Sequence, residues 1–301
     1  MKIPVGIVGY GNLGQNVEKH LLNSDIFELK AVFSKRSLIN AVPYSKIENY
    51  KDKIELLFLC GGSQNELESQ SFNLIQNFSI AESYDNHARL ESYISKLDLI
   101  AKENKKVALC SFGWDPGLFS FMRGLFDSLD SPPYTFWGKG LSQGHTQAIK
   151  NISGVIDAVQ FTIPNEDAID LIKQGIDVER GKLLHKRQCF VVANKADKER
   201  IYREIVTMPD YFDGYETEVN FVSQEELNSI KIFSHRGSVL SKKDEMNFSL
   251  ELNSNPDFTS RVLTTFARNY ASLKEKKEYG SFTIFDLPLS NILKQNKYKY
   301  L

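Results

Sequence analysis

The chain has 301 residues, which is long enough for two domains and a large buried core. Its 37 lysines and arginines against 38 aspartates and glutamates give a formal net charge of −1, so neither nucleic acid nor a membrane surface is an expected partner. No apolar run approaches the roughly 18 residues of a membrane span, and the three cysteines do not suggest a disulfide framework. A cytoplasmic protein is therefore expected.

An apolar strand followed directly by a glycine-rich turn begins the chain. Residues 3–8 are the strand, Gly9-Tyr10-Gly11-Asn12-Leu13-Gly14 is the turn, and residues 15–22 carry apolar side chains at helical spacing. This order is typical of a dinucleotide-binding unit, in which unpaired N–H groups at the helix N-terminus bind phosphates. The strand before the turn distinguishes the motif from a plain glycine turn, so we predict a cofactor site. Because the fold begins at Ile3, we expect no targeting peptide.

A second predicted strand, residues 29–33, ends at Ser34, Lys35 and Arg36. An NAD-selective site usually places a carboxylate at this point to bind the ribose 2′-hydroxyl. A carboxylate would repel the 2′-phosphate of NADP, whereas a hydroxyl and two cations would bind it. A solvated basic loop is the alternative, but we interpret the triplet as part of an NADP(H) site.

Further strands alternate with helices in the first half of the chain. Strands are predicted at residues 54–60, 78–84 and 107–112, and a helix at residues 90–102. The alternation favours an α/β fold with a Rossmann-type, doubly wound parallel sheet. In such sheets, ligands bind beyond the carboxyl ends of the strands.

Small residues and acids follow the ends of these predicted strands. Cys60, Gly61, Gly62 and Ser63 would leave room for the cofactor to cross the sheet edge. Asp85 and Asp115 could bind a substrate ammonium group or transfer a proton. Each acid could instead be an ordinary loop or turn residue, since Asp before Pro favours turns.

The character of the sequence changes after residue 117. A helix at residues 118–129 leads out of the first domain, and the glycine- and aromatic-rich stretch 136–145 is expected to be a loop. Strands are predicted at residues 159–163, 188–193, 216–222 and 246–252, followed by an amphipathic helix at residues 258–274. The alternation within residues 246–252 indicates a half-exposed antiparallel sheet. We therefore predict a dinucleotide-binding domain at residues 1–118, with residues 256–301 packing back on it, and a second α+β domain at residues 119–255.

Candidate ligands in the second half are isolated. Arg187 precedes a predicted strand, and His235 lies in a Ser-His-Arg-Gly segment. A lone arginine or histidine is usually structural, so position alone does not assign a role to either. His185 and Cys189 lack a second pair of metal ligands, and we expect no metal site.

Short motifs along nearly the whole chain resemble those of one enzyme family. They occupy residues 8–14, 33–36, 84–87, 113–117, 135–138, 140–145, 185–192, 208–212 and 255–258. Several of them, such as Tyr84-Asp85-Asn86-His87 and Gly113-Trp114-Asp115-Pro116-Gly117, are specific rather than general to dinucleotide folds. The family that the chain resembles is the NADP-dependent meso-diaminopimelate D-dehydrogenases.

The resemblance implies a reaction and an assembly. The reaction is the reversible oxidative deamination of meso-2,6-diaminopimelate at its D-centre, which yields L-2-amino-6-oxopimelate, ammonia and NADPH for lysine and peptidoglycan precursor biosynthesis. The assembly is a homodimer, and residues 119–255 would be the substrate-binding and dimerisation domain. A closing motion between the two domains is also implied.

The resemblance also implies roles for individual residues. Asp85 and Asp115 would contact the reacting D-amino acid end, near Trp114, Gln143 and Gly144. The distal L-end would be bound by Thr162, Arg187, His235 and Asn255, and Trp137 would lie on the pocket wall. Because the substrate is zwitterionic at both ends, each end needs charge partners, and binding both decides which Cα–H faces the nicotinamide. We expect an aspartate, directly or through water, to move the proton.

The chain departs from the family pattern at four places. Lys35 replaces an arginine, Lys139 replaces a proline, and Thr146-Gln147 stands where Ser-Asp is common. Residues 230–243 match only around His235. Gln147 is expected near the reacting end, so its substitution bears on substrate preference. The alternatives are a related NADP-dependent dehydrogenase or reductase of another D-amino acid or a cyclic lysine precursor, and a non-catalytic NADP-binding sensor.

Overall fold

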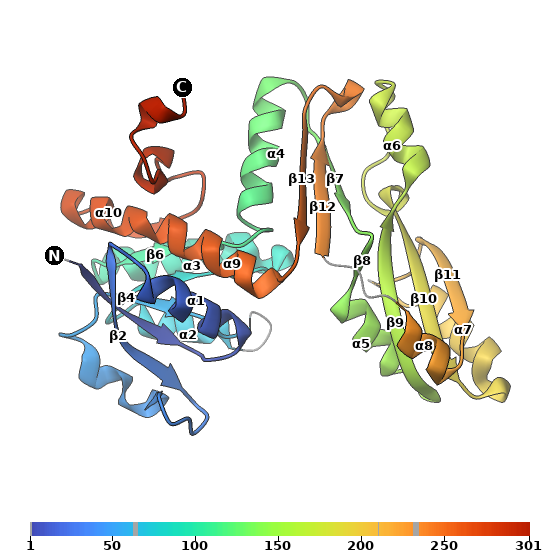
Figure 1. Ribbon diagram of the computed structural model, residues 1–301, viewed down its shortest axis with the longest axis horizontal. Coiled ribbons are helices and arrows are strands. Elements are labelled where there is room, and N and C mark those ends of the chain that lie inside the picture. Colours follow the sequence, from blue (N-terminus) through green and yellow to red (C-terminus); the bar gives the residue numbers. More distant parts are fainter. Residues whose placement is uncertain (1, 63–65, 210, 231–234) are drawn as a thin grey trace. The chain divides into compact units, whose positions relative to one another are not determined.

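The computed structural model describes residues 2–62, 66–209, 211–230 and 235–301, which fold into two compact units (Figure 1). The first unit comprises Met1–Phe121 and Asn255–Leu301, and the second comprises Met122–Ser254. Ser63, one of the predicted cofactor residues, lies outside the described residues.

A sheet of seven parallel strands forms the centre of the first unit. The strands are β1 (Ile3–Val8), β2 (Phe27–Ser34), β3 (Val42–Pro43), β4 (Leu56–Leu59), β5 (Ser79–Glu82), β6 (Val107–Leu109) and β14 (Gly280–Phe282). Their order is β14-β6-β5-β4-β1-β2-β3, which contains the order 3-2-1-4-5-6 of a Rossmann sheet. The predicted fold class is therefore confirmed, and β14 is an additional edge strand that the sequence analysis missed.

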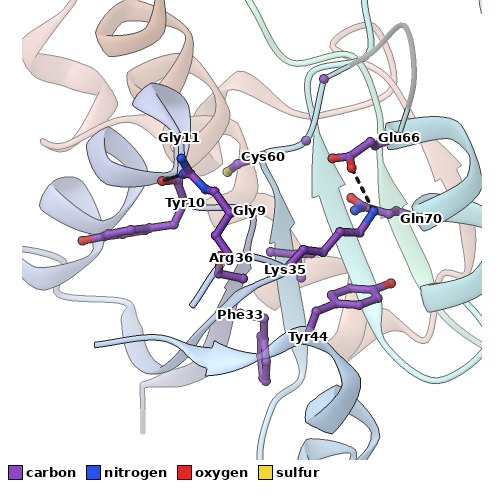
Figure 2. A pocket seen from close by; sticks show the side chains of 14 residues that line it. Gly9, Tyr10, Gly11, Phe33, Lys35, Arg36, Tyr44, Cys60, Glu66 and Gln70 are labelled. Carbon is purple, nitrogen blue, oxygen red and sulfur yellow. Dashed lines mark hydrogen bonds and ion pairs between the residues drawn. The ribbon is translucent and has the colours of Figure 1, made fainter. Parts of the chain in front are cut away.

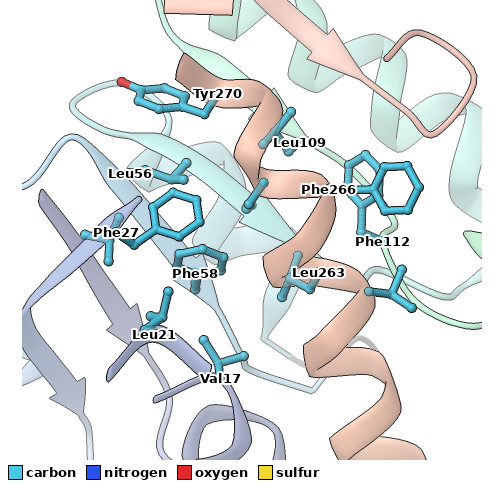
Figure 3. Close-up of a cluster of buried hydrophobic side chains, with 14 of the residues drawn as sticks. Val17, Leu21, Phe27, Leu56, Phe58, Leu109, Phe112, Leu263, Phe266 and Tyr270 are labelled. Carbon is cyan, nitrogen blue, oxygen red and sulfur yellow. The ribbon is translucent and has the colours of Figure 1, made fainter. Parts of the chain in front are cut away.

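Helices cover both faces of this sheet. One face packs against α1 (Asn12–Leu22), α9 (Asn255–Phe266) and α10 (Tyr270–Lys276), and the other against α2 (Leu67–Leu74) and α3 (Leu90–Glu103). Figure 3 shows the first layer, in which the labelled side chains are Val17, Leu21, Phe27, Leu56, Phe58, Leu109, Phe112, Leu263, Phe266 and Tyr270. Because both faces are buried, β4 is a continuous apolar run of fully buried residues.

The helix predicted at residues 258–274 is wrong in its start and in its continuity. It begins at Asn255, and a short 3₁₀ segment, Ala267–Asn269, separates α9 from α10. Asn269 is fully buried there, and its side chain donates to the carbonyl of Phe266 at 3.1 Å and accepts from Asn291 at 3.0 Å. The apolar periodicity continues across the break, so the pattern alone does not reveal it.

The second unit contains two small sheets and several helices. The four-stranded sheet has the order β11-β10-β9-β8, and the three-stranded antiparallel sheet has the order β13-β12-β7. The strands are β7 (Tyr134–Trp137), β8 (Gly140–Leu141), β9 (Val155–Pro164), β10 (His185–Ala193), β11 (Glu216–Phe221), β12 (His235–Leu240) and β13 (Asn247–Leu252). The helices are α4 (Leu118–Leu129), which continues from the first unit, α5 (Gln143–Lys150), α6 (Glu166–Lys173), α7 (Lys198–Val206) and α8 (Gln224–Ser229).

Residues 136–145 do not form the predicted loop. They contain the end of β7, all of β8 and the start of α5. Gly138 has a φ of 104°, and a Cβ atom there would lie 2.0 Å from the carbonyl oxygen of Thr162. The glycine therefore allows a close approach between backbones, which the sequence analysis interpreted as a loop signal.

The strand at residues 247–252 follows its predicted alternation of exposed and more buried positions, and it pairs antiparallel with β12.

Within the described residues, no helix combines the length and the apolar character that crossing a bilayer requires.

Candidate active site

A cavity of about 300 Å³ lies at the carboxyl ends of β1, β2 and β4 (Figure 2). The predicted cofactor residues that line it are Gly9, Tyr10, Gly11, Ser34, Lys35, Arg36, Cys60, Gly61 and Gly62. The other three described candidates, Asn12, Leu13 and Gly14, form the first turn of α1. The structure therefore brings segments from three strand ends together around one cavity.

The glycines of the first turn serve different purposes. Gly9 has a φ of 93°, in a region that favours glycine. A Cβ atom on Gly14 would lie 2.1 Å from the carbonyl oxygen of Gly9, so α1 packs close to the turn only without a side chain there. A Cβ atom on Gly11 would have no neighbour within 4 Å, which leaves open space on the cavity side.

Two cations approach this cavity from the end of β2. The hydroxyl of Ser34 accepts the backbone N–H of Arg36 at 3.0 Å, and Nη2 of Arg36 donates to the carbonyl of Tyr10 at 2.8 Å. Nζ of Lys35 lies 2.8 Å from Glu66 Oε1, and this hydrogen bond raises the pKa of Lys35 (Figure 2). The turn at residues 34–36, which the Ser34 hydroxyl stabilises, therefore presents one guanidinium group and one ammonium group to the cavity.

The cavity wall also contains five residues that were not predicted to bind the cofactor, and three of them are polar: Tyr44, Glu66 and Gln70. Gln70 is 6% exposed, and its Oε1 has no hydrogen-bond partner among the residues that the structure describes. Glu66 and Gln70 lie at the start of α2, a helix that was not predicted. Parallel neighbouring strands require a crossover, usually helical, so the gap between the predicted strands at residues 54–60 and 78–84 was an available signal.

The two candidate catalytic acids follow adjacent strands of the first unit. Asp85 follows β5 and is exposed, whereas the side chain of Asp115, beyond β6, is only 9% exposed. Asp115 Oδ2 lies 3.8 Å from Nε2 of His87, and Oδ1 lies 3.5 Å from the hydroxyl of Ser120. The structure therefore brings the segment of Asp85 and the segment of Asp115 side by side.

Trp114 and Asn255 also belong to the first unit. The Trp114 ring packs edge-on against Phe119, with 5.6 Å between ring centroids. Asn255 is the first residue of α9, and its side chain accepts the hydroxyl of Thr259 at 3.0 Å.

Arg187 and Thr162 lie opposite each other on β10 and β9 of the second unit. Both are 8% exposed, and Nη1 of Arg187 donates to the Thr162 hydroxyl at 2.7 Å. The guanidinium carbon lies 4.1 Å from the centre of the Tyr215 ring, and Nε is buried without a hydrogen-bond partner in the described part of the chain. Burial lowers the pKa of Arg187, and no carboxylate among the described residues forms an ion pair with it.

Two histidines near Arg187 are neutral. Burial, together with the charge of Arg187, lowers the pKa of His185 to about 4 and that of His145 to about 4. Nε2 of His185 accepts the backbone N–H of Trp137 at 2.8 Å, which positions this candidate wall residue. A metal-binding role for His185 was not favoured by the sequence, and its hydrogen bond to Trp137 was not predicted.

The remaining candidates of the second unit occupy the starts of elements. Gln143 and Gly144 begin α5, and His235 begins β12 opposite Leu252. Burial lowers the pKa of His235. Across the described ranges, no three His, Cys, Asp or Glu side chains form a cluster that could hold a metal ion.

Known proteins resemble this chain over almost its full length. Residues 113–254 match the family model described as the diaminopimelic acid dehydrogenase C-terminal domain. The meso-diaminopimelate D-dehydrogenase of Acetivibrio thermocellus is 41% identical over 95% of this chain and 93% of the relative. The enzyme of the same name from Corynebacterium glutamicum is 38% identical, also over 95% of this chain and 93% of the relative.

Solved structures agree with these relatives. The C. glutamicum diaminopimelate dehydrogenase in complex with diaminopimelate has a TM-score of 0.83 and 36% identity, over 99% of this chain and 98% of that one. An engineered D-amino acid dehydrogenase bound to NADP⁺ has a TM-score of 0.78 and 35% identity over the same shares. The identity and the coverage show that this chain belongs to the family of meso-diaminopimelate D-dehydrogenases.

Proposed function

We infer that this chain is an NADP-dependent dehydrogenase that reversibly deaminates meso-2,6-diaminopimelate at its D-centre, giving L-2-amino-6-oxopimelate, ammonia and NADPH. Relatives that are 38–42% identical over 95% of the chain carry the name of this activity. The structural observation that best supports it is the buried guanidinium of Arg187. A buried cation without an ion-pair partner among the described residues suits an anionic ligand.

The first-unit cavity fits NADP(H). Gly11 leaves open space for a pyrophosphate beside the N-terminus of α1, and Lys35 and Arg36 can bind a 2′-phosphate. Buried Gln70, whose Oε1 has no partner within the described ranges, suits a hydroxyl or amino donor of the adenosine. Bound NADP⁺ supplies the hydride acceptor.

We propose that the two ends of the substrate bind different residues. The L-end carboxylate would receive charge-assisted hydrogen bonds from Arg187 and its neighbour Thr162. The L-end would also contact His235 and Asn255, and the wall would include Trp137. The reacting D-end would contact Asp85 and Asp115, with Trp114, Gln143 and Gly144 beside it.

The reaction needs a group that moves protons at the D-end. Asp115 is the more buried of the two acids, with a side chain 9% exposed, and it lies close to Ser120 and His87. We propose that Asp115 or Asp85 accepts the proton of the substrate ammonium, directly or through water. Hydride leaves the D-carbon, water adds to the resulting imine, and ammonia departs.

We further propose a cytoplasmic homodimer. Cys60, Cys110 and Cys189 are free and buried, which suits a reducing compartment. The dimer rests on the family resemblance, with residues 119–255 as the dimerisation domain and residues 1–118 together with 256–301 as the dinucleotide-binding domain. Light scattering of the purified protein would test the oligomeric state.

Ammonia dependence separates this function from its rivals. With NADPH and L-2-amino-6-oxopimelate, we expect cofactor oxidation only when ammonia is added, because the amine nitrogen must come from it. A reductase of a cyclic lysine precursor would oxidise NADPH without ammonia, and a sensor would bind NADPH without turnover. Either outcome would contradict the proposed function.

A further inference from the structure

Glu82 is a buried carboxylate at the carboxyl end of β5, beneath the two segments that carry the candidate acids. It is 0% exposed, and it pairs in register with Leu59 of β4. No Lys or Arg among the described residues forms an ion pair with it. A buried charge without an ion-pair partner costs free energy unless hydrogen bonds compensate for it. The hydrogen-bond partners of Glu82 therefore indicate its structural role.

The hydrogen bonds of Glu82 lead to the backbone of both acid-bearing segments. Its carboxylate accepts the N–H of Tyr84 and, at 3.1 Å, the N–H of Ser111. Its backbone carbonyl accepts the N–H of Phe112 at 3.0 Å. One residue therefore connects the strand end that precedes Asp85 with the strand end that precedes Asp115.

The backbone of the second segment needs such support. Ser111 has a φ of 63°, a left-handed conformation that is unfavourable for residues other than glycine. The hydrogen bond from the Ser111 N–H to the Glu82 carboxylate stabilises that conformation. The tight turn from Gly113 to Gly117 follows immediately. The direction in which Asp115 leaves the sheet thus depends on a bond to Glu82.

We propose that Glu82 is a positioning residue that holds the Asp85 and Asp115 segments in their working arrangement, and that only its ionised form does so. This inference rests on the proposed function for its effect on turnover. The carboxylate can accept both N–H groups at once, one on each oxygen. Protonation converts one oxygen into a donor, which conflicts with one of the two N–H groups.

The surroundings of Glu82 raise its pKa towards neutrality. Burial raises the pKa of Glu82 to about 7, against the hydrogen bonds from Tyr84 and Ser111, which lower it. The titratable groups that face it are Tyr93 from α3, Cys110 beyond β6 and Tyr84 beyond β5, and burial raises the pKa of each. These groups stay neutral near pH 7, so no neighbouring ionisation obscures that of Glu82.

The raised pKa of Glu82 also makes the stability of the folded protein depend on pH. Because the pKa of Glu82 is higher in the folded state than its ordinary value of 4.5, the folded protein binds the proton first. The stability that protonation contributes is present at low pH and is lost as the pH rises through about 7. The ionised form of Glu82, which the proposal requires for turnover, therefore stabilises the folded state less than the protonated form does.

Glu82→Gln and Glu82→Asp test the proposal, with Glu68→Gln as the matched control. Glu68 lies on α2 near the hydroxyl of Tyr84 and the guanidinium of Arg89, so the control changes a nearby carboxylate without removing a hydrogen bond to the backbone of either segment. We expect Glu82→Gln to lower kcat for meso-diaminopimelate about tenfold to a hundredfold. It should also abolish the rise of kcat around pH 7 that we expect in the wild-type protein and in Glu68→Gln. Glu82→Asp should restore part of kcat, and a wild-type kcat and pH profile in Glu82→Gln would overturn the proposal.

Amide hydrogen exchange tests the positioning role of Glu82 without a measurement of turnover. After correction for intrinsic rates, we expect residues 83–86 and 110–116 of the wild-type protein to lose protection as the pH falls below 7. The same segments of Glu82→Gln should be weakly protected at every pH. If Glu82→Gln does not fold, Glu82→Asp replaces it in this measurement. Protection that does not depend on pH in the wild-type protein would overturn the inference. If the wild-type protein does not oxidise diaminopimelate, the proposed function fails and the exchange data still settle the role of Glu82.

Discussion

The environment of Arg187 shows how a single residue can be kept ready for a ligand. Its guanidinium lies between the Thr162 hydroxyl, at 2.7 Å, and the Tyr215 ring, at 4.1 Å from its centre. These contacts orient the group but do not neutralise it, and the two nearest histidines are held neutral. A substrate carboxylate would compensate for the desolvation that the fold imposes.

Arg187→Ala should therefore weaken the binding of meso-diaminopimelate by ~2–5 kcal/mol, because a desolvated carboxylate loses its charge partner. The measurement is KM for the substrate, with NADPH affinity measured separately and expected to stay unchanged. Arg203→Ala is the matched control, since the Arg203 side chain is 73% exposed on α7 and forms a surface ion pair with Glu199. Unchanged kinetics in Arg187→Ala would remove Arg187 from the substrate site.

Glu66 adds an unexpected negative charge to the cofactor cavity. It lies 2.8 Å from Lys35, so a 2′-phosphate would compete with it for the ammonium group. Because this pair is exposed, we expect Glu66→Gln to lower KM for NADP⁺ only about two- to fivefold and to leave NAD⁺ use unchanged. Glu28→Gln, which loses an exposed pair with Lys30 on β2, is the control. A higher KM for NADP⁺ in Glu66→Gln would show that the carboxylate assists binding instead.

At the scale of elements, the first turn and α1 separate a packing requirement from a binding requirement. A Cβ atom on Gly14 would lie 2.1 Å from the carbonyl of Gly9, whereas one on Gly11 would meet nothing within 4 Å. We expect Gly14→Ala to lower the free energy of unfolding by about 1–3 kcal/mol, through overpacking against backbone.

Gly11→Ala should instead leave the free energy of unfolding within about 1 kcal/mol of the wild-type value. It should weaken NADP⁺ binding about tenfold or more, because the new methyl group occupies the approach to the pyrophosphate. Denaturant unfolding and fluorescence titration of NADPH measure the two effects. Equal losses of stability in both variants would contradict this division of roles.

The elements of the first unit were largely predictable because their signals are local. Buried parallel strands are continuous apolar runs, and the glycine turn follows β1 directly. The missed features depend on tertiary contacts. β14 has three residues, the break at Asn269 depends on hydrogen bonds to distant residues, and Gly138 is set by the Thr162 backbone.

The candidate site was predictable only where its residues belong to a motif. Ser34, Lys35 and Arg36 follow a strand in a recognisable place, and the cavity contains all three. Arg187 and His235 were named through the family resemblance, since no local pattern marks them. Glu82 and Gln70 were not predicted, because burial of a polar side chain is a property of the packed fold.

At the scale of the whole molecule, the two units should respond to acid in opposite ways. In the second unit, His145 and His185 have pKa values of about 4, below their ordinary value of 6.5, so their protonation favours the unfolded state. Their contribution to stability is present above pH 6.5 and is lost as the pH falls towards 4. In the first unit, protonation of Glu82 below about pH 7 favours the folded state.

The chain has two tryptophans, Trp114 in the first unit and Trp137 in the second, which makes this difference measurable. In a Trp114→Phe variant, we expect the Trp137 fluorescence to report a loss of unfolding free energy between pH 6.5 and pH 4.5 of about 2 kcal/mol for each of His145 and His185. His185→Gln, whose amide oxygen can still accept the Trp137 N–H, should reduce this slope. A slope that does not change in His185→Gln would exclude His185 as its source.

Absorbance of the reduced nicotinamide, followed with the purified chain, NADP⁺ and each of meso-, LL- and DD-diaminopimelate, tests most directly whether this protein oxidises a D-centre while binding an L-end. We expect NADPH to form with the meso isomer, only weakly with the DD isomer, and not with the LL isomer, which has no D-centre. Reduction of NADP⁺ with LL-diaminopimelate, or none with the meso isomer, would contradict the assigned reaction.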